Sequence, residues 1–443
     1  MPGPAPVPVE GDAVLPGAVD VVVIGGGIIG TSTALELAER GLRVALCEKG
    51  RIGHEQSGRN WGWVRIALRD PREVPLMVEA IRIWGDLDRR IGADTGYHRC
   101  GIVFAAQDAA QRDRLERWSR HLAPFQIPAR MLDRDGMAAM GMEAVPGMVG
   151  GLHVPMDARA EPQKAAPAIA EAARACGAAV LTGCAVRGVE TAGGAVTGVV
   201  TERGAIRCDA VVLAGGAWSN LFCGNLGIDL PQLGVINHVL RTAPVPGGPD
   251  VSLWSREVSI RRRADGGYTV ARGSGNTVPI VPNSFRYGLR FFRALRMQRR
   301  ELHLRLGREF FHEAARPRRW ALDAETPFER ERVLDPRPSA RMLGGLMAAA
   351  GRALPALQGV QVAQSWAGCI DVTPDAIPVI SGVDAVPGLH IATGFSGHGF
   401  GIGPGAGRLM ADLVTGAAPC VPAGDFRLSR FSDGSVVAPD DGM

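Results

Sequence analysis

The sequence has few of the features that indicate a secreted, metal-binding or nucleic-acid-binding protein. Its eight cysteines are scattered and none forms a CxxC pair, which argues against a disulfide framework and against a zinc site. Aromatic residues make up only 5% and the net charge is only +4, so the chain offers neither stacking platforms for bases nor a basic footprint. We expect no bound metal and no nucleic-acid partner.

Long apolar runs and targeting signals are missing too. No stretch approaches the ~20 apolar residues that a helix needs to span a bilayer. Residues 1–18, MPGPAPVPVEGDAVLPGA, have no basic n-region and no apolar core, so we interpret them as a disordered Pro/Gly tail rather than a signal peptide. Together with the unpaired cysteines, these absences predict a cytoplasmic protein.

The composition is that of a globular protein with more than one domain. The chain has 443 residues, of which 46% are hydrophobic and 21% charged. A chain of this length exceeds a single ordinary core, so two domains are expected. Glycine is abundant, with 59 residues, which favours tight turns and close approaches of the backbone to a ligand.

A glycine-rich turn near the N-terminus carries the most specific motif. An apolar strand over 20–24 leads into it, a helix over 30–40 follows, and a second strand over 42–48 ends at Glu48. The glycines of a GxGxxG motif allow a tight turn, close approach of a pyrophosphate and close helix–strand packing, and an acidic residue after the second strand binds ribose hydroxyls. The motif predicts a dinucleotide site without a 2′-phosphate, formed by Gly25, Gly26, Gly27, Ile28, Ile29 and Gly30.

Two later blocks repeat the pattern of an apolar strand followed by glycines, and they complete the fold prediction. The second has an Ala-rich helix over 163–176 and strands at 179–181, 186–190, 196–201 and 208–213; the third has a strand over 389–393, a glycine-rich loop to Gly403 and a helix over 405–413. The predicted fold class is α/β: a discontinuous Rossmann-like domain (19–95, 156–228 and 365–430) and a second α+β substrate domain built on an antiparallel sheet (96–155 and 229–364).

Three segments then resemble the D-amino acid oxidase-like family, which includes glycine oxidase, sarcosine oxidase and the D-amino acid dehydrogenases. They are KGRIGHEQSGRNWGWVR (49–65), WAGCIDVTPDAIPVIS (366–381) and GFSGHGFGIGPGAG (394–407). They occur in family order, and the resemblance covers 20–416. It implies FAD as the cofactor, with further contacts from Lys49, Gln56, Ser57, Arg59, Asn60, Val186, Gly215, Gly394, His398, Gly399, Phe400 and Gly401. His398 has an alternative role as a polar residue of the helix-entry turn.

The same resemblance implies the reaction. An amine or an N-substituted or D-amino acid would lose a hydride from its N–CH carbon to flavin N5, and the imine product would hydrolyse in water. The electron acceptor would be O2 or a redox partner. Two alternatives stay open, namely a dehydrogenase subunit that docks a partner and a flavin-dependent 2-hydroxy acid dehydrogenase.

Three residues are candidates for the catalytic side. Arg65 occupies the place where sarcosine-oxidase-like members carry an Arg near the flavin, with Arg59 and Arg69 as competitors. His238 lies on a strand that reaches toward the substrate in relatives, although it could equally be a strand-edge polar residue. Asp371 departs from the family, because many amino-acid-oxidising members have Arg where this chain has Ile370, just before Asp371; Asp371 could bind a substrate cation or be structural.

Cys369 raises the question of a covalent flavin. Some sarcosine oxidases link FAD through a Cys in this region. In this chain Cys369 lies one position nearer Asp375 than such a linking residue, so we expect non-covalent FAD and a packed thiol.

The segment 285–319 stands apart from the rest of the chain. It contains eleven Arg and three Glu, and Phe291, Phe292, Leu295, Leu302, Leu306 and Phe310 recur at helical spacing. We interpret it as a basic amphipathic helix pair. It could be a solvated face, an oligomer contact, or a docking surface for an acidic partner or anionic lipid.

Overall fold

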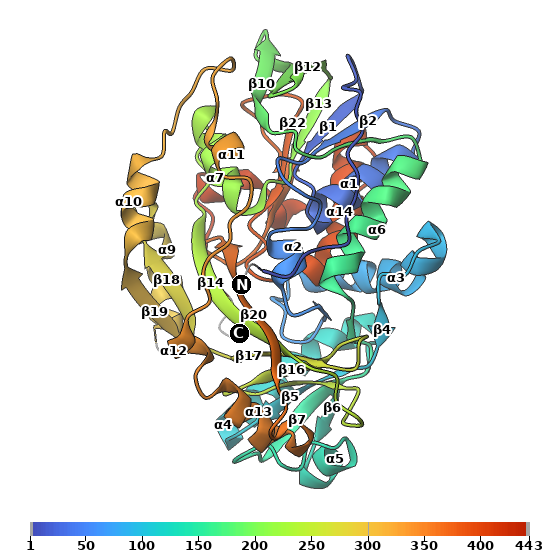
Figure 1. The fold of residues 1–443 in the computed structure, drawn as a ribbon, viewed down its shortest axis with the longest axis vertical. Helices are drawn as coiled ribbons and strands as arrows, with labels where there is room; N and C mark the ends of the chain where they lie inside the picture. The colour runs from blue at the N-terminus through green and yellow to red at the C-terminus, as the bar shows by residue number, and fades with distance from the viewer. Residues whose placement is uncertain (1–2, 300, 440–443) are drawn as a thin grey trace.

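Two large sheets with helices around them form the protein (Figure 1), and the computed structural model describes residues 3–299 and 301–439. The first is a six-stranded sheet in the order β21-β22-β13-β1-β2-β9, in which only β21 runs antiparallel. These strands are β1 (Val21–Ile24), β2 (Val44–Cys47), β9 (Ala179–Leu181), β13 (Ala210–Leu213), β21 (Val379–Gly382) and β22 (Leu389–Thr393).

Helices cover one face of this sheet, and the strands within 186–207 pack on the other face. α1, α6 and α14 pack side by side, and β1, α1 and β2 form the expected βαβ unit. Strands β1 and β2 are buried along their whole length, which explains their continuous apolar sequence. The helices are α1 (Ile28–Glu39), α2 (Gln56–Arg59), α3 (Val74–Ile91), α6 (Pro162–Ala175), α7 (Ser219–Asn225) and α14 (Gly399–Thr415).

The second sheet is largely antiparallel and forms the other half of the molecule. Its order is β19-β18-β14-β17-β16-β15-β5-β7-β6, with β20 paired along β14. Its strands are β5 (Ile102–Ala106), β6 (Arg130–Leu132), β7 (Gly150–Val154), β14 (Leu233–Thr242), β15 (Ser252–Trp254), β16 (Ser259–Arg262), β17 (Tyr268–Ala271), β18 (Asn276–Ile280), β19 (Leu302–Leu306) and β20 (Val362–Val372).

Smaller elements connect and flank the two halves. Two three-stranded sheets are present, β10-β11-β12 and β3-β8-β4. Their strands are β3 (Trp63–Val64), β4 (His98–Arg99), β8 (Ala158–Arg159), β10 (Val186–Ala192), β11 (Ala195–Thr201) and β12 (Gly204–Arg207). The remaining helices are α4 (Ala109–Ser119), α5 (Arg134–Ala139), α8 (Pro282–Arg286), α9 (Gly288–Gln298), α10 (Arg308–Ala315), α11 (Pro327–Arg330), α12 (Ala340–Leu343) and α13 (Leu346–Ala353).

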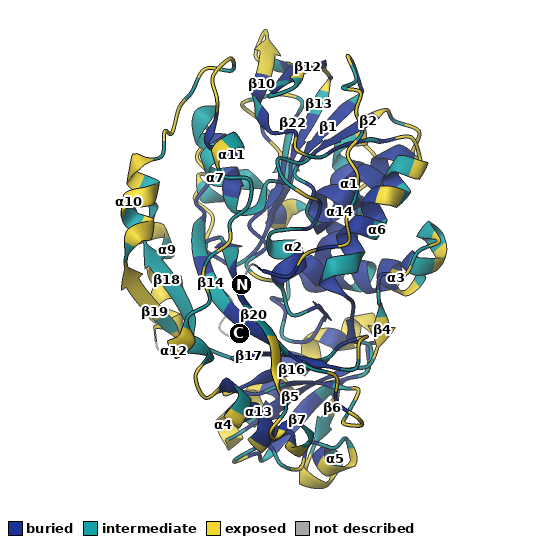
Figure 2. Cartoon of the chain, in the orientation of Figure 1, coloured by how far each residue is buried: buried dark blue, intermediate teal, exposed yellow. Residues whose placement is uncertain are grey.

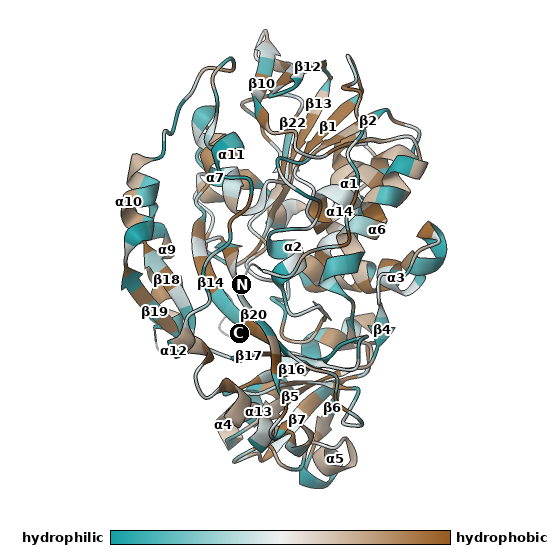
Figure 3. Cartoon of the chain, viewed as in Figure 1, coloured by the Kyte–Doolittle hydropathy of each residue, from teal (hydrophilic) through white to brown (hydrophobic). Residues whose placement is uncertain are grey.

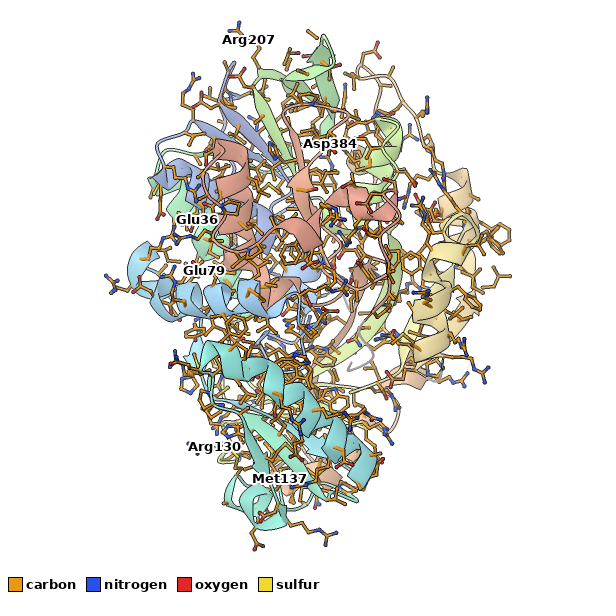
Figure 4. All side chains as sticks on the ribbon, turned by 180° about the vertical axis from the view of Figure 1, so that it is seen from behind. Glu36, Glu79, Arg130, Met137, Arg207 and Asp384 are labelled. Atoms are coloured by element: carbon orange, nitrogen blue, oxygen red, sulfur yellow. The ribbon has the colours of Figure 1, made fainter. Side chains whose placement is uncertain are left out.

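Burial follows this layered plan, with the core shown dark blue in Figure 2 between helices and sheet. Ion pairs also join these helices to one another. Glu36 of α1 pairs with Arg90 of α3 at 2.7 Å, and Glu79 of α3 pairs with Arg408 of α14 at 3.4 Å. Both glutamates are labelled in Figure 4. The three helices α1, α3 and α14 therefore form one packed unit.

The structure confirms the fold class and changes several local expectations. The glycine-rich loop expected up to Gly403 ends sooner, because α14 already begins at Gly399. A Cβ on Gly403 would come within 2.8 Å of Ile28, and one on Gly407 within 2.5 Å of Ser32. These glycines therefore serve close packing of α14 on α1 rather than loop flexibility.

The N-terminal segment is also different from the expectation of a disordered tail. Val7 donates its N–H to Gln163 of α6, and Asp12 donates to Val180 of β9, each at 2.8 Å. Asp12 also accepts from the Val180 N–H at 2.7 Å. Residues 3–18 thus run extended along α6 and β9, because their backbone groups pair at the edge of the six-stranded sheet.

Two assignments along the second sheet also change. The segment 285–319 is not a simple helix pair, since β19 lies between α9 and α10 and pairs in parallel with β18. Leu302 and Leu306, which helical spacing placed on a helix face, are strand residues. β20 begins at Val362 and pairs with β14, so the piece expected to start at 365 in the cofactor domain opens inside the large sheet.

Replacement by Ala should have opposite effects on stability at two helical glycines, one inside the α1–α14 contact and one outside it. Gly407→Ala should destabilise the protein by about 1–3 kcal/mol, because its Cβ would overlap Ser32. Gly224→Ala in α7 meets no atom within 4 Å and should be neutral or stabilising by about 0.5–1 kcal/mol. Urea unfolding of both variants measures the difference; equal stabilities would contradict the packing role of Gly407.

Candidate functional site

A cavity of about 820 Å³ extends between the two large sheets and reaches the first turn of two helices. Gly27, the N-cap of α1, and His398, the N-cap of α14, both line it. Helix N-termini present free N–H groups and a partial positive charge. The cavity therefore has two places suited to negative charge or to a polar acceptor.

The glycine turn has the geometry that a pyrophosphate site needs. Gly25 has φ of +107°, and a Cβ on it would lie 2.4 Å from the Ala214 carbonyl. A Cβ on Gly27 would instead project toward the cavity, where only the Ser57 Oγ lies near it, at 3.1 Å. The Ser57 hydroxyl also accepts from the Ile28 N–H at 2.8 Å. Space is thus kept open directly above the start of α1.

Glu48 closes the turn from the end of β2. Its two carboxylate oxygens accept N–H groups from Gly26 at 2.7 Å and from Gly50 at 2.6 Å. Burial raises the pKa of this carboxyl, while Lys49 and the two amides oppose that shift. Glu48 lines the cavity, and its contact with a ribose stays a prediction.

Most of the residues that sequence reasoning selected come together around this cavity. Its lining includes Gly25, Gly27, Ile28, Ile29, Glu48, Lys49, Gln56, Ser57, Arg59, Asn60, Arg65, Val186, Gly215, Asp371, His398, Gly399, Phe400 and Gly401. Gly26, Gly30 and Gly394 do not line it and act through backbone packing; a Cβ on Gly30 would lie 1.9 Å from the Gly25 carbonyl. The lining fits FAD, because the glycine turn of α1, the carboxylate of Glu48 and the N-terminus of α14 meet in one cavity.

His238 is not brought to the cavity. Its ring lies on the other side of β14 from Asn237, which does line the cavity, because alternate side chains of a strand face opposite sides. His238 Nδ1 accepts the Ser339 N–H at 3.2 Å, and burial lowers the pKa of the ring. The expectation of a catalytic His238 is therefore not supported, and the strand neighbour is the residue that faces the site.

Asp371 lines the cavity but is already engaged. Its Oδ2 accepts from the Gln232 Nε2 at 2.8 Å, the Thr393 Oγ1 at 3.1 Å and the Gly394 N–H at 2.7 Å. Burial raises its pKa, and these donors work against that shift. Such a set of donors is what a structural carboxylate in the interior requires. A role in binding a substrate cation stays a prediction.

Arg65 has donors left for a ligand. It bonds through Nη1 to the carbonyls of Ala67 and Leu68, and its guanidinium lies 5.7 Å from the centre of the Phe104 ring. Among the described residues no partner is found for its Nε or Nη2, and neither atom is sealed in the interior. Burial and the neighbouring Arg69 lower its pKa to about 9, so an anion beside it would relieve an unfavourable charge.

Arg69 and His398 form a second group beside Arg65 that sequence reasoning only partly identified. Arg69 donates Nε to the Arg65 carbonyl at 3.1 Å and Nη2 to the His398 carbonyl at 3.4 Å. His398 Nδ1 contacts the Glu73 Oε2 at 3.1 Å, and burial, followed by Arg69, lowers the pKa of the ring to about 4. His398 is therefore neutral near pH 7 and does have the positioned partner that was missing in the sequence.

An aromatic wall connects the two halves of the site. The Trp61 and Trp63 rings lie 5.0 Å apart, Trp63 lies 6.3 Å from Phe104, and Phe104 lies 5.8 Å from Trp254. All four line the cavity. Phe104 and Trp254 lie on β5 and β15, far from any motif, so only their pairing in the large sheet brings them to the site. No local sequence signal could have identified them.

A long strap from the second domain covers the opposite end of the cavity. Residues 316–335 pass over Trp218 and Val186 and contribute Phe328 and Arg332 to the lining. Arg332 pairs with Glu202 at 2.6 Å, Glu329 pairs with Arg187 at 2.9 Å, and Asp335 pairs with Arg59 at 2.5 Å. The Thr326–Glu329 capping box of α11 was a readable helix-start signal for this strap.

Comparison with known proteins agrees with this geometry. A family model described as FAD dependent oxidoreductase, DAO, matches residues 20–413. An L-amino acid deaminase structure from Proteus myxofaciens is 35% identical with a TM-score of 0.93 and covers 98% of both chains. Glycine oxidase of Pseudomonas aeruginosa is 28% identical over 90% of this chain and 96% of its own length. Sarcosine oxidase subunit beta of Rhizobium meliloti is 26% identical over 94% and 89%.

The open space at Gly27 predicts a variant that folds but does not bind FAD. Gly27 has extended φ and ψ of −74° and 178°, so Gly27→Val is allowed by the backbone, while its side chain would fill the space above α1. The purified variant should be colourless with wild-type circular dichroism. Gly17→Val, at a glycine with no atom within 4 Å, is the control that should stay yellow. A yellow Gly27→Val protein would contradict the proposed phosphate position.

Cys369 predicts how the cofactor is held. The thiol lines the cavity, and burial followed by the Asp371 charge raises its pKa to about 12, so it stays protonated and a poor nucleophile. Acid or heat should therefore release all of the FAD, and Cys369→Ser should bind it equally. Flavin fluorescence that stays on the denatured wild-type polypeptide, and is lost in Cys369→Ser, would show a covalent link.

Proposed function

Because the chain belongs to the DAO family of FAD-dependent oxidoreductases, we propose that it oxidises the carbon–nitrogen bond of an α-amino acid. The observation that carries this proposal is the guanidinium of Arg65, which lies half-buried beside the aromatic wall with donors free to bind a carboxylate. Relatives whose names include L-amino acid deaminase and glycine oxidase support an amino-acid substrate. The proposal narrows the substrate class from amines in general to amines that also carry a carboxylate.

Each wall of the inner cavity would contribute to holding such a substrate. Arg65 would bind the carboxylate through charge-assisted hydrogen bonds, which also relieves its repulsion by Arg69. Trp61, Trp63 and Phe104 exclude water and favour the neutral amine, because an ammonium group loses solvation among apolar rings. FAD, when bound, would supply the two-electron oxidant for this site, since flavin chemistry accepts the hydrogen of the carbon next to that nitrogen as a hydride.

The protein's own acid–base groups fit a role in positioning. His398 is neutral and fixed between Glu73 and the first turn of α14, and Asp371 fixes the Gly394 N–H just before it. Both residues thereby hold the loop 394–398, of which residues 395–398 line the cavity. The imine formed would leave the site and hydrolyse in water. No step requires a general base beyond this arrangement.

Two further readings differ from the proposal in the substrate or in the acceptor. A 2-hydroxy acid would also present a carboxylate to Arg65, and flavin can take a hydride from a C–OH carbon. The acceptor is O2 or a redox partner, and the similarity to a sarcosine oxidase subunit is compatible with a partner. Anaerobic reduction identifies the substrate, because it reports on flavin reduction before any acceptor acts, and reoxidation by O2 then tests the acceptor.

Replacement of Arg65 tests the substrate class. The holoenzyme should be reduced anaerobically by an α-amino acid, and Arg65→Gln should raise the half-saturating concentration by about 10–100-fold, since a hydrogen bond to a charged group contributes about 1.5–3 kcal/mol. The half-saturating concentration of Arg65→Lys should lie between those of the wild type and Arg65→Gln. Arg114→Gln, at a cavity-lining arginine on the exposed face of α4, is the control.

The screen includes L- and D-amino acids, N-methyl amino acids, amines and 2-hydroxy acids. Equal reduction by amines that lack a carboxylate, with Arg65→Gln unchanged, would disprove the assignment. Asp371→Asn tests the competing idea that Asp371 binds a substrate cation. Weaker substrate binding by this variant, with FAD retained, would favour that idea. Unchanged reduction kinetics would leave Asp371 with its structural contacts alone.

A further inference from the structure

The outer edge of the large sheet exposes apolar side chains that no described part of the chain covers. Helices α8, α9 and α10 contain no buried residue. Leu289 is 95% exposed, Phe285 73% and Phe311 71%. The other exposed large apolar residues of this surface, which we call the edge surface, are Phe292, Leu295, Met297, Leu304 and Leu306.

The gathering of these residues in one place is unusual for a solvated face. Of thirteen exposed large hydrophobic residues in the described chain, eight belong to the edge surface. Single exposed apolar residues need no explanation, but a contiguous group indicates an interaction. In Figure 2 the elements β19, α9 and α10 lie together at one margin with exposed residues, and Figure 3 shows hydrophobic and hydrophilic residues alternating along them.

Arginines interleave with the apolar side chains on the same outward face. Along α9, Leu289 and Phe292 lie one turn apart, and Arg293 and Arg296 follow at helical spacing beside them. Within residues 3–299 and 301–439, no ion pair involves Arg293, Arg296, Arg299, Arg305 or Arg308. The edge surface therefore presents unpaired positive charge together with apolar groups.

We propose that the edge surface docks the enzyme on an anionic lipid bilayer. A bilayer offers both required partners at once: acyl chains for Leu289 and Phe292, and headgroup phosphates for the arginines around them. The face is a projecting helix and strand edge rather than a groove, so it is suited to insertion into an interface. The attachment is peripheral, since no helix among the described residues is long and apolar enough to cross a membrane.

Two other occupants fit the charges less well. A second copy would place one arginine-rich face against another, and like charges across an interface are unfavourable. An acidic protein would satisfy the arginines but would also need a matching apolar groove for eight protruding side chains. A lipid surface requires no such complementary shape.

Docking here has a consequence for the site. Met297 of the edge surface also lines the cavity, as do its sequence neighbours Gln298 and Glu301. Attachment would thus hold this side of the cavity close to the headgroups. Ligands that partition into the bilayer would reach it from there.

Vesicle sedimentation of the FAD-loaded enzyme tests the proposal. The wild type should bind vesicles of phosphatidylcholine mixed with phosphatidylglycerol, more weakly at high salt, and should not bind phosphatidylcholine alone. Arg293→Gln/Arg296→Gln should lower the partition coefficient by about tenfold or more. Leu289→Ser/Phe292→Ser should abolish binding while anaerobic reduction by substrate is unchanged.

Matched controls make the same chemical changes elsewhere. Arg82→Gln/Arg89→Gln alters two exposed arginines of α3, and Val14→Ser/Val436→Ser alters two exposed apolar residues, and both variants should bind like the wild type. No binding of the wild type at low salt, equal binding to neutral vesicles, or equal loss in the controls would overturn the proposal. So would a wild-type oligomer that Leu289→Ser/Phe292→Ser converts to a monomer.

Discussion

The close packing of α14 on α1 is the contact on which the site depends. Glycines at 403 and 407 let the two helices approach until a single added carbon would collide with Ile28 or Ser32. Because both helices begin at the same cavity, their N-termini converge there although about 370 residues separate them in sequence. A bulkier residue at the contact would move α14 and the loop before it, and with them residues 395–401 of the cavity lining.

The cavity combines an excess of buried positive charge with a hydrophobic wall. Arg65 and Arg69 lie side by side, and the acids near them, Asp157 and Glu73, are themselves buried and partly unpartnered. Burial raises the pKa of Asp157 to about 7, so this acid neutralises Arg65 less completely than an exposed one would. An anionic group bound here would relieve the unfavourable positive charge of Arg65 and Arg69. The carboxylate proposal therefore rests on Arg65.

Closure of the cavity comes from segments that join the two halves. The strap over 316–335 links them through Arg332–Glu202, Glu329–Arg187 and Asp335–Arg59. Three ion pairs together restrict the motion of the strap, because breaking any one of them leaves a partly buried charge without its partner. The edge surface lies just before this strap in the chain, so a surface contact and the cover of the cavity belong to one continuous insert.

The sequence alone determined the parts of this protein whose function depends on neighbouring residues. The turn 25–30, Glu48 and the family segments predicted a dinucleotide site, FAD and a Rossmann-like fold, because a phosphate turn needs its glycines at fixed local spacing. The tertiary structure decided the rest. Strand alternation turned His238 away and Asn237 inward, and β-sheet pairing brought Phe104 and Trp254 to Arg65. Three donors from distant segments occupied Asp371, and backbone pairing at a sheet edge ordered the N-terminal segment. Such contacts join residues far apart in the chain, so no local pattern records them.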